Sequence, residues 1–331
     1  MMGSRSKISA ITMGDPSGIG PEIILKSFGN PEIGNSAVVV IGDYSVMLEA
    51  HQMLNIKSFG LNRLSAIAGC KFTPETLNIL DLNLFRSENL QRGIVNAVSG
   101  NAAFQYLKKA IELVRNMEID AIATAPLNKE ALHLAGHAYP GHTEILAALT
   151  DTKDYAMLLH DKKLSVIHVS THIPLIRAIT TLSSERIEKV IELADAAMEK
   201  LCGKRPRIAV AGINPHAGEN GLFGNEEMDE ILPAVRNMKG KGFNVEGPVP
   251  PDTVFLQAVN GRYDIVVAMY HDQGHIPLKL LGFSTGVNIT VGLPFFRTSV
   301  DHGTAFEIAW KGIANEDSMS EAIRLSIKLA Q

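Results

Sequence analysis

Cysteine is scarce in this chain of 331 residues, which contains only Cys70 and Cys202. Two cysteines without a CxxC pair build neither a disulfide framework nor a thiolate metal site, and such sparse use is typical of a reducing compartment. We therefore expect a cytoplasmic protein.

Long apolar runs are also missing. No segment approaches the roughly 20 apolar residues that a membrane-spanning helix needs. Residues 1–7 lead directly into an expected strand and lack the apolar core of a secretory signal. The sequence thus predicts neither export nor membrane insertion.

An excess of basic charge is absent. The chain has 31 basic and 35 acidic residues, a formal net charge of -4, spread along its length without a basic block. Nucleic acid and anionic membranes select clustered lysine and arginine. We expect neither as a partner.

The dinucleotide fingerprint GxGxxG and the phosphate loop GxxxxGK[ST] do not occur. Residues 14–22 form instead a different glycine-rich turn between an expected strand and an expected helix. Backbone amides in such a turn can approach an anion or a cofactor. A tight turn with Pro21 at the first helical position explains the same residues equally well.

What the sequence does contain is a repeated alternation of short β-branched runs and amphipathic segments. This length favours two domains, and the alternation predicts α/β units with a mostly parallel sheet and helices on both faces. We expect residues 1–135 with 290–331 in one subdomain and 136–289 in the other. The expected strands cover 8–12, 37–42, 77–80, 121–124, 164–169, 207–211, 264–269 and 286–290, and the expected helices 44–52, 96–117 with Ser99 as N-cap, 144–149, 184–200, 227–238, 305–310 and 318–329.

Three of these strands run directly into a histidine. His172, His216 and His271 follow the expected strands 164–169, 207–211 and 264–269. Parallel strands share one carboxyl edge, where ligands bind in α/β sheets. Three neutral imidazoles there match a catalytic metal site, for which zinc is the best candidate and cobalt, manganese and magnesium are alternatives. Each histidine is, taken alone, more often a hydrogen-bonding loop residue.

Two further histidines lie beside this trio. His168 falls inside its strand and is expected in the core, whereas His275 follows Gly274 and is expected to line the pocket without binding metal.

Several cationic and polar residues are candidates for holding a phosphate or carboxylate. Lys279 follows His271 by eight residues, and Asn288 and Arg297 come later in the chain. His142 and Thr143 open an expected helix and offer an imidazole, a hydroxyl and free backbone amides. The alternatives are solvated loop cations and, for Thr143, a simple N-cap.

Five motifs together resemble one family, the 4-hydroxythreonine-4-phosphate dehydrogenase (PdxA) family. They occupy residues 14–22, 125–129, 141–144, 214–219 and 270–274. Residues 137–142, 170–173 and 275–283 most resemble the branch of D-threonate and D-erythronate 4-phosphate dehydrogenases.

The resemblance implies a homodimeric oxidative decarboxylase that uses NAD and a divalent metal. It implies two interwoven subdomains of the isocitrate and isopropylmalate dehydrogenase type, with the active site in the cleft. Metal ligands then fall on His172, His216 and His271, one of them from the partner subunit. The substrate contacts implied are His142, Thr143, Lys279, Asn288 and Arg297.

The stretch 301–309 is similar to the nucleotide-binding turn of the wider dehydrogenase group, which implies cofactor contacts at His302, Gly303 and Thr304. Read without the resemblance, it is a capped helix. For proton transfer we favour Lys279, then Asp252 on its stiff loop.

The expected reaction converts D-threonate or D-erythronate 4-phosphate to dihydroxyacetone phosphate and CO2. An amino substrate, 4-phosphohydroxy-L-threonine, would instead give 3-amino-2-oxopropyl phosphate. A metal-dependent hydrolase or aldolase would use the same histidines, and a non-catalytic sensor would need only the phosphate contacts.

Overall fold

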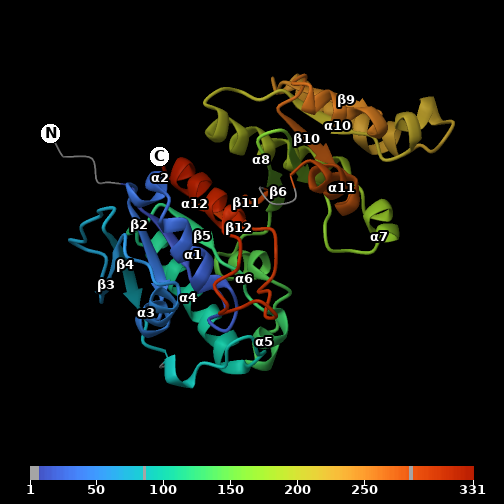
Figure 1. Ribbon diagram of the computed structural model, residues 1–331. Helices are drawn as coiled ribbons and strands as arrows, with labels where there is room; N and C mark the ends of the chain where they lie inside the picture. The colour runs from blue at the N-terminus through green and yellow to red at the C-terminus, as the bar shows by residue number, and fades with distance from the viewer. Residues whose placement is uncertain (1–6, 85–86, 283–285) are drawn as a thin grey trace. The chain divides into compact units, whose positions relative to one another are not determined.

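The computed structural model describes residues 7–84, 87–282 and 286–331 and divides the chain into two compact units (Figure 1). The first unit extends to Thr152 and resumes at Leu293–Gln331, and the second is Lys153–Gly292. The sequence placed the boundaries after residues 135 and 289, so His142 and Thr143 lie in the first unit rather than with the expected metal ligands.

The sheet of the first unit is parallel throughout, in the order β3-β4-β2-β1-β5-β12. Its central strands are short, β-branched and buried on both faces, as parallel sheets require. The strands are β1 (Ser9–Thr12), β2 (Val38–Gly42), β3 (Gly60–Leu64), β4 (Thr76–Asp81), β5 (Ala121–Thr124) and β12 (Phe296–Val300).

Helices cover both faces of that sheet. The C-terminal helix α12 packs on β1, β5 and β12 beside α1, whereas α4 packs on β1, β2 and β5 beside α5 and α6 (Figure 1). The helices are α1 (Gly20–Phe28), α2 (Pro31–Gly34), α3 (Tyr44–Met53), η1 (Ser87–Asn89), α4 (Ala97–Arg115), α5 (Lys129–Leu134), α6 (His142–Leu149) and α12 (Asp317–Ala330).

The strands of the second unit follow the order β11-β6-β7-β10-β8-β9. β6 runs antiparallel to β11 and β7, and the remaining pairs are parallel. The strands are β6 (Ala156–His160), β7 (Ser165–His168), β8 (Ile208–Ala211), β9 (Val245–Val249), β10 (Ile265–Ala268) and β11 (Val287–Val291).

Helix α8 lies across β6, β7, β8 and β10 with α9 beside it, and α10 and α11 pack on β8, β10 and β7. The helices and turns of this unit are α7 (Leu175–Thr180), α8 (Ser184–Cys202), η2 (Pro215–Gly221), η3 (Glu227–Ile231), α9 (Leu232–Gly240), α10 (Pro251–Val259) and α11 (His271–Gly282). The predicted α/β class with a mostly parallel sheet is confirmed.

Two local predictions are wrong, and one of the alternatives is excluded. The expected helix 305–310 is a series of turns, with positive φ at Ala305 and Trp310. Asn96, not Ser99, caps α4, because its side chain accepts the Ser99 amide. Helix α6 begins at His142 after Gly141, so Thr143 lies inside the helix and is not its N-cap.

Both cysteines are free. Along the described part of the chain, we find no helix with the length and apolar character to span a bilayer.

Candidate functional site

The three strands that the sequence singled out are neighbours in the second unit. β10 pairs in parallel with β7 on one side and with β8 on the other. Their carboxyl ends therefore share one edge. His172, His216 and His271 follow these strands by four, five and three residues.

Two side chains tie the three strand ends together. Gln273 is buried, accepts the Met269 amide after β10 and donates to the Gly212 carbonyl after β8, at 2.6 and 2.7 Å. Ser170, after β7, donates to the Met269 carbonyl at 2.9 Å. The loops that carry the histidines are thus fixed to one another near their origin.

His172 and His271 lie side by side, with ring centres 5.7 Å apart. Two imidazoles that share a tetrahedral metal at about 2.1 Å bring their ring centres to roughly 5 Å, so this spacing fits two ligands of one ion. Asp272 contacts the Nδ1 of His271 at 2.6 Å and so leaves Nε2 for a metal, the usual carboxylate–histidine arrangement. Both rings line a cavity of about 380 Å³, together with residues of α7.

His275 and His168 stand behind His271. The His275 ring stacks on His271 at 3.6 Å and 12°, and its Nδ1 lies 3.2 Å from His168 Nε2. His168 Nδ1 contacts the Met157 carbonyl, and burial lowers the pKa of His168 to about 3, which keeps it neutral. Gly274 allows this packing, since a Cβ there would lie 2.4 Å from His168 Nε2. His168 ends β7 and is buried, as the sequence predicted.

His216 lies against Asp252, at the start of α10, with Nδ1 3.8 Å from Oδ2. The two side chains are 60% and 57% exposed. Among residues 7–84, 87–282 and 286–331, no three acidic, cysteine or histidine side chains form a group that could hold a metal. One chain thus brings His172 to His271 and His216 to Asp252, and the donor chemistry of both pairs fits a divalent metal.

Lys279 and Asn288 are also in this unit. Lys279 is eight residues beyond His271 on α11, about 12 Å further along the helix axis. Asn288 lies in β11, and its Oδ1 is buried without a hydrogen-bond partner. A buried unsatisfied acceptor of this kind is costly and marks a place for a donor.

The first unit holds a buried cation, Arg297, on β12. Its Nε and Nη2 donate to Thr124 Oγ1 at 3.1 and 2.6 Å, from the end of the neighbouring strand β5. Burial lowers the pKa of Arg297 to about 9, although the nearby Glu144 carboxylate acts in the other direction. A guanidinium held out of water in this way is suited to an anion.

His142 and Thr143 form the first turn of α6 near this cation. Desolvation and the Arg297 charge hold the pKa of His142 well below its usual value. The ring is therefore neutral at pH 7 and donates one N–H without adding charge. Backbone amides of a first helical turn and a neutral imidazole N–H are groups that can bind an anion.

A second feature of the first unit is a cavity of about 620 Å³ lined by residues that include His302, Gly303, Thr304 and Asn128. The loop 302–310 packs on the glycine-rich turn 14–20. The Ile19 amide donates to the Thr304 carbonyl at 3.1 Å, and Trp310 Nε1 donates to the Pro16 carbonyl at 3.0 Å. Gly18 permits this approach, because a Cβ would meet Thr304 at 2.9 Å.

The comparisons with known proteins cover nearly the whole chain. The family model described as pyridoxal phosphate biosynthetic protein PdxA matches residues 35–326. The chain belongs to the PdxA family.

Similar relatives are named as dehydrogenases. The chain is 56% identical to D-threonate 4-phosphate dehydrogenase of Pectobacterium atrosepticum, over 98% of this chain and 100% of that protein. It is 54% identical to the protein of the same name from Salmonella typhimurium, again over 98% and 100%. A crystal structure of 4-hydroxythreonine-4-phosphate dehydrogenase from Klebsiella pneumoniae superposes with a TM-score of 0.91 at 54% identity, covering 98% of each chain. The predicted family and the prediction of a dehydrogenase are confirmed.

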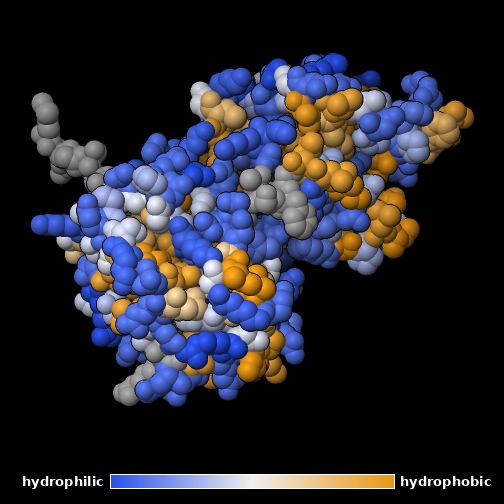
Figure 2. All heavy atoms as spheres, in the orientation of Figure 1, coloured by the Kyte–Doolittle hydropathy of each residue, from blue (hydrophilic) through white to orange (hydrophobic). Residues whose placement is uncertain are grey.

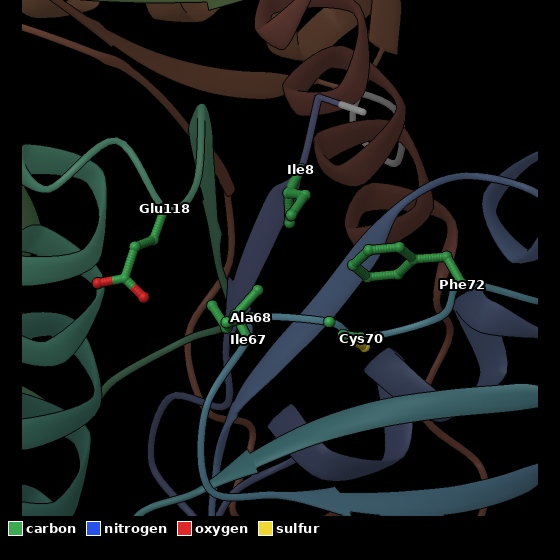
Figure 3. A pocket seen from close by; sticks show the side chains of 7 residues that line it. Ile8, Ile67, Ala68, Cys70, Phe72 and Glu118 are labelled. Atoms are coloured by element: carbon green, nitrogen blue, oxygen red, sulfur yellow. The ribbon is translucent and has the colours of Figure 1, made fainter. Parts of the chain in front are cut away.

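A further cavity of this PdxA-family chain lies away from these residues. It has about 400 Å³ and is lined by Ile8, Phe72, Cys70 and their neighbours, and Figure 3 shows the Phe72 ring turned toward Ile8. Ile8 precedes β1, so this cavity lies at the amino edge of the sheet, opposite to the edge that α/β proteins use for ligands. Burial raises the pKa of the Cys70 thiol, which disfavours the reactive thiolate form.

The sequence analysis missed three residues that organise the site. Thr124 accepts hydrogen bonds from Arg297, and Gln273 connects the ends of two strands. Glu227 accepts three hydrogen bonds from residues that precede His216. Gln273 lies inside the motif 270–274, which was a usable signal. Thr124 and Glu227 carry no local signal, because their partners are remote in sequence.

Proposed function

We propose that the chain catalyses the NAD-dependent oxidative decarboxylation of D-threonate 4-phosphate or D-erythronate 4-phosphate to dihydroxyacetone phosphate and CO2. The observation that carries this proposal is the full-length similarity to relatives of that name, combined with histidines at three adjacent strand ends. Hydride passes from C3 to NAD while the C3 hydroxyl group loses its proton, the bond from C2 to the carboxylate breaks with release of CO2, and a proton returns to C2.

A divalent metal, zinc as first choice and cobalt, manganese or magnesium as alternatives, would be held by His172, His216 and His271. When bound, it would lower the pKa of the substrate hydroxyl and polarise the resulting ketone. The chain's own contribution is orientation. Asp272 fixes the tautomer of His271, and Asp252 lies beside His216.

The substrate would be bound by His142, Thr143, Lys279, Asn288 and Arg297. Support comes from the buried charge of Arg297, from the neutral imidazole of His142 and from the unsatisfied Oδ1 of Asn288. The last of these is an acceptor and suits a substrate hydroxyl group rather than a phosphate.

For proton transfer, Lys279 stays our first choice and Asp252 the second. The 3.8 Å contact of Asp252 with His216 gives this carboxylate a position next to a metal ligand. Lys279, on α11, has the longer reach but begins about 12 Å from His271 along the helix. Replacement of each residue separately distinguishes them, because loss of the general base removes the acidic limb of the pH-rate profile, where protonation of the base lowers the rate.

NAD would bind at His302, Gly303 and Thr304. The cavity of about 620 Å³ that these residues line supports this placement. Trp310 is the single tryptophan, and its Nε1 donates to the Pro16 carbonyl in the turn 14–20, on which the loop 302–310 packs. Energy transfer from Trp310 to bound NADH should therefore report binding, and Gly303→Val should abolish it.

We also propose a homodimer in which His216 and His271 of one site come from different protomers. In one chain, His216 and Asp252 are exposed, and His271 pairs with His172 instead. Apolar side chains gather over α7, α10 and α11 (Figure 2), including Ile176, Leu256 and Leu280, which are more than 60% exposed. Exposed apolar surface of this extent favours a protein partner.

The reaction is tested by following NADH formation with three substrates side by side. We expect turnover of D-threonate or D-erythronate 4-phosphate, and 4-phosphohydroxy-L-threonine is included because the similar solved structures carry that activity in their names. Product formation without NADH would refute the dehydrogenase and favour a hydrolase or an aldolase. His216→Ala should lose metal and turnover but remain folded.

Mixing tests the shared site. His216→Ala and His271→Ala homodimers should each be inactive. A heterodimer formed after mild dissociation has one site with both substitutions and one with neither, so activity should return. No recovery, with exchange verified by mass, would contradict the assignment of these two histidines to different protomers.

A further inference from the structure

The turn that carries His216 has an unusual backbone. Every residue from 216 to 221 in η2 has a positive φ, between 44° and 92°, and four of them, His216, Ala217, Glu219 and Asn220, are not glycine. Residues of L configuration visit this left-handed region singly rather than in runs. Such a run persists only where the surrounding structure imposes it, and it is typical of functional sites.

The group that lies under this turn is the carboxylate of Glu227, which is 2% exposed. Its Oε1 accepts the backbone N–H groups of Ile213 and Asn214, both at 2.7 Å. Its Oε2 accepts Asn214 Nδ2 at 2.9 Å. These donors occupy the link between the end of β8 and the first left-handed residue. Hydrogen bonds to a buried carboxylate are short and strong, so they fix the entry of the chain into the turn.

Two glycines let the turn close around the same carboxylate. A Cβ at Gly218 would lie 2.7 Å from Glu227 Oε2, and one at Gly212 would lie 3.1 Å from Oε1 and 2.8 Å from the Ala217 Cα. Glu227 itself begins η3, a single wide helical turn of the π type, a feature frequent at functional sites. The left-handed turn is therefore folded around one anionic side chain.

We propose that Glu227 is the positioning residue for His216. Because His216 is the first left-handed residue, the anchor at Ile213 and Asn214 sets the direction in which its side chain leaves the backbone, toward Asp252. Glu227 would act through His216 and not by contact with the substrate or the metal. This inference rests on the proposed role of His216 as a metal ligand.

Glu226 provides a matched control. Its Oε2 also accepts Asn214 Nδ2, at 2.7 Å, but the two backbone amides donate to Glu227, and Glu226 is only half-buried. In Glu227→Gln, an NH2 group replaces Oε2 and faces the NH2 group of Asn214, so two donors oppose each other. A flip of the Asn214 amide would relieve this, but it would place Asn214 Oδ1 against the Glu226 carboxylate. Glu227→Gln therefore disturbs the anchor, whereas Glu226→Gln leaves the backbone contacts in place.

The test measures metal affinity, by competition of Zn²⁺ and Co²⁺ with a chelator, and hydrogen exchange of residues 212–226 in metal-free enzyme. Loss of a residue that orients a ligand typically weakens metal binding by about 10- to 100-fold, and we expect that for Glu227→Gln. Its exchange at residues 213–221 should accelerate. Glu226→Gln should show neither change. In the His216→Ala background, Glu227→Gln should cause no additional loss of affinity.

Failure of this inference is distinguishable from failure of the proposed function. Parent-like affinity in Glu227→Gln, with weakened affinity in His216→Ala, would overturn the inference alone. An equal loss in the His216→Ala background would also overturn it, since Glu227 would then not act through His216. Parent-like affinity in His216→Ala would remove the metal role itself. If Glu227→Gln does not fold, Asn214→Ala provides the test, because it deletes the Nδ2 contacts with Glu227 and Glu226 but keeps the two backbone contacts of Glu227 Oε1. It should show a smaller loss of affinity, and no loss there would overturn the inference.

Discussion

Arg297→Met should separate the stability of the protein from its activity. Arg297 is 2% exposed and donates twice to one neutral oxygen, Thr124 Oγ1. Its pKa is lowered to about 9, with burial as the dominant cause, so the Glu144 carboxylate does not offset the loss of hydration. The free protein therefore keeps a guanidinium group in its interior, and we expect that charge to serve an anionic ligand.

The magnitudes follow from this arrangement. Replacement of a buried charge by an apolar side chain of similar volume is often neutral or stabilising, by about 1–4 kcal/mol. Two hydrogen bonds to Thr124 are lost, at about 1.5–3 kcal/mol each for a charged donor. The desolvation cost of the buried guanidinium group is removed at the same time. We expect a free energy of unfolding within about 2 kcal/mol of the parent. Loss of a desolvated ion pair with substrate should reduce kcat/KM by roughly 30- to 5000-fold, equivalent to about 2–5 kcal/mol.

Urea unfolding and steady-state kinetics measure both quantities on the same preparation. Thr124→Val is the matched control, because it keeps the cation and removes its hydroxyl partner. That variant should be destabilised by about 1–3 kcal/mol. If Arg297→Met instead lost more than about 3 kcal/mol of stability and kept its kcat/KM, Arg297 would be a structural residue and our reasoning about the anion would be refuted.

Three further predictions concern other parts of the molecule. His275→Ala should weaken metal binding about 10-fold in a chelator competition, since the stacked ring supports His271, whereas Ile276→Ala on the exposed side of α11 should not. Gly14→Ala should lower the free energy of unfolding, measured in urea, by about 2 kcal/mol or more, because φ is +71° and a Cβ would lie 2.3 Å from the Pro126 carbonyl oxygen. Gly60→Ala is the control, because a Cβ at Gly60 would meet no atom within 4 Å. The lowered pKa of His142 means that the unfolded chain binds the proton first, so stability should fall as pH drops below 6.5, and His142→Phe should flatten that decline in thermal melts.

Strands were predictable wherever the buried residues were β-branched and apolar, as in β2 and β10. β12 escaped prediction because its sequence, Phe296 to Val300, contains Arg297, Thr298 and Ser299, which are buried but polar. Arg297 and Thr298 donate hydrogen bonds to residues of β5 and α12, which are remote in sequence. β3 was missed for the opposite reason, since this edge strand is largely exposed and has no apolar pattern.

The expected helix 305–310 shows how a tertiary contact overrides local spacing. Its apolar residues recur at helical intervals, yet Ala305 and Trp310 adopt positive φ. Trp310 donates to the Pro16 carbonyl and also lies beneath Arg92, so two remote segments determine its position. A pattern of apolar residues reports burial but does not say which segment covers it.

The common location of the three histidines could be predicted from the sequence, because the prediction does not require the order of the strands in the sheet. Any parallel strands present their carboxyl ends at one edge, so a histidine after each strand is brought toward that edge whether the order is 7-8-10 or, as here, 7-10-8. A shared edge alone does not set the orientation of the imidazole rings. That orientation depends on Glu227, fifteen residues beyond Gly212, and on Gln273, which follows another strand and donates to the Gly212 carbonyl. Residues that supply chemistry repeat at equivalent positions and are visible as a pattern, whereas each residue that orients them occurs once and is visible only through its contacts.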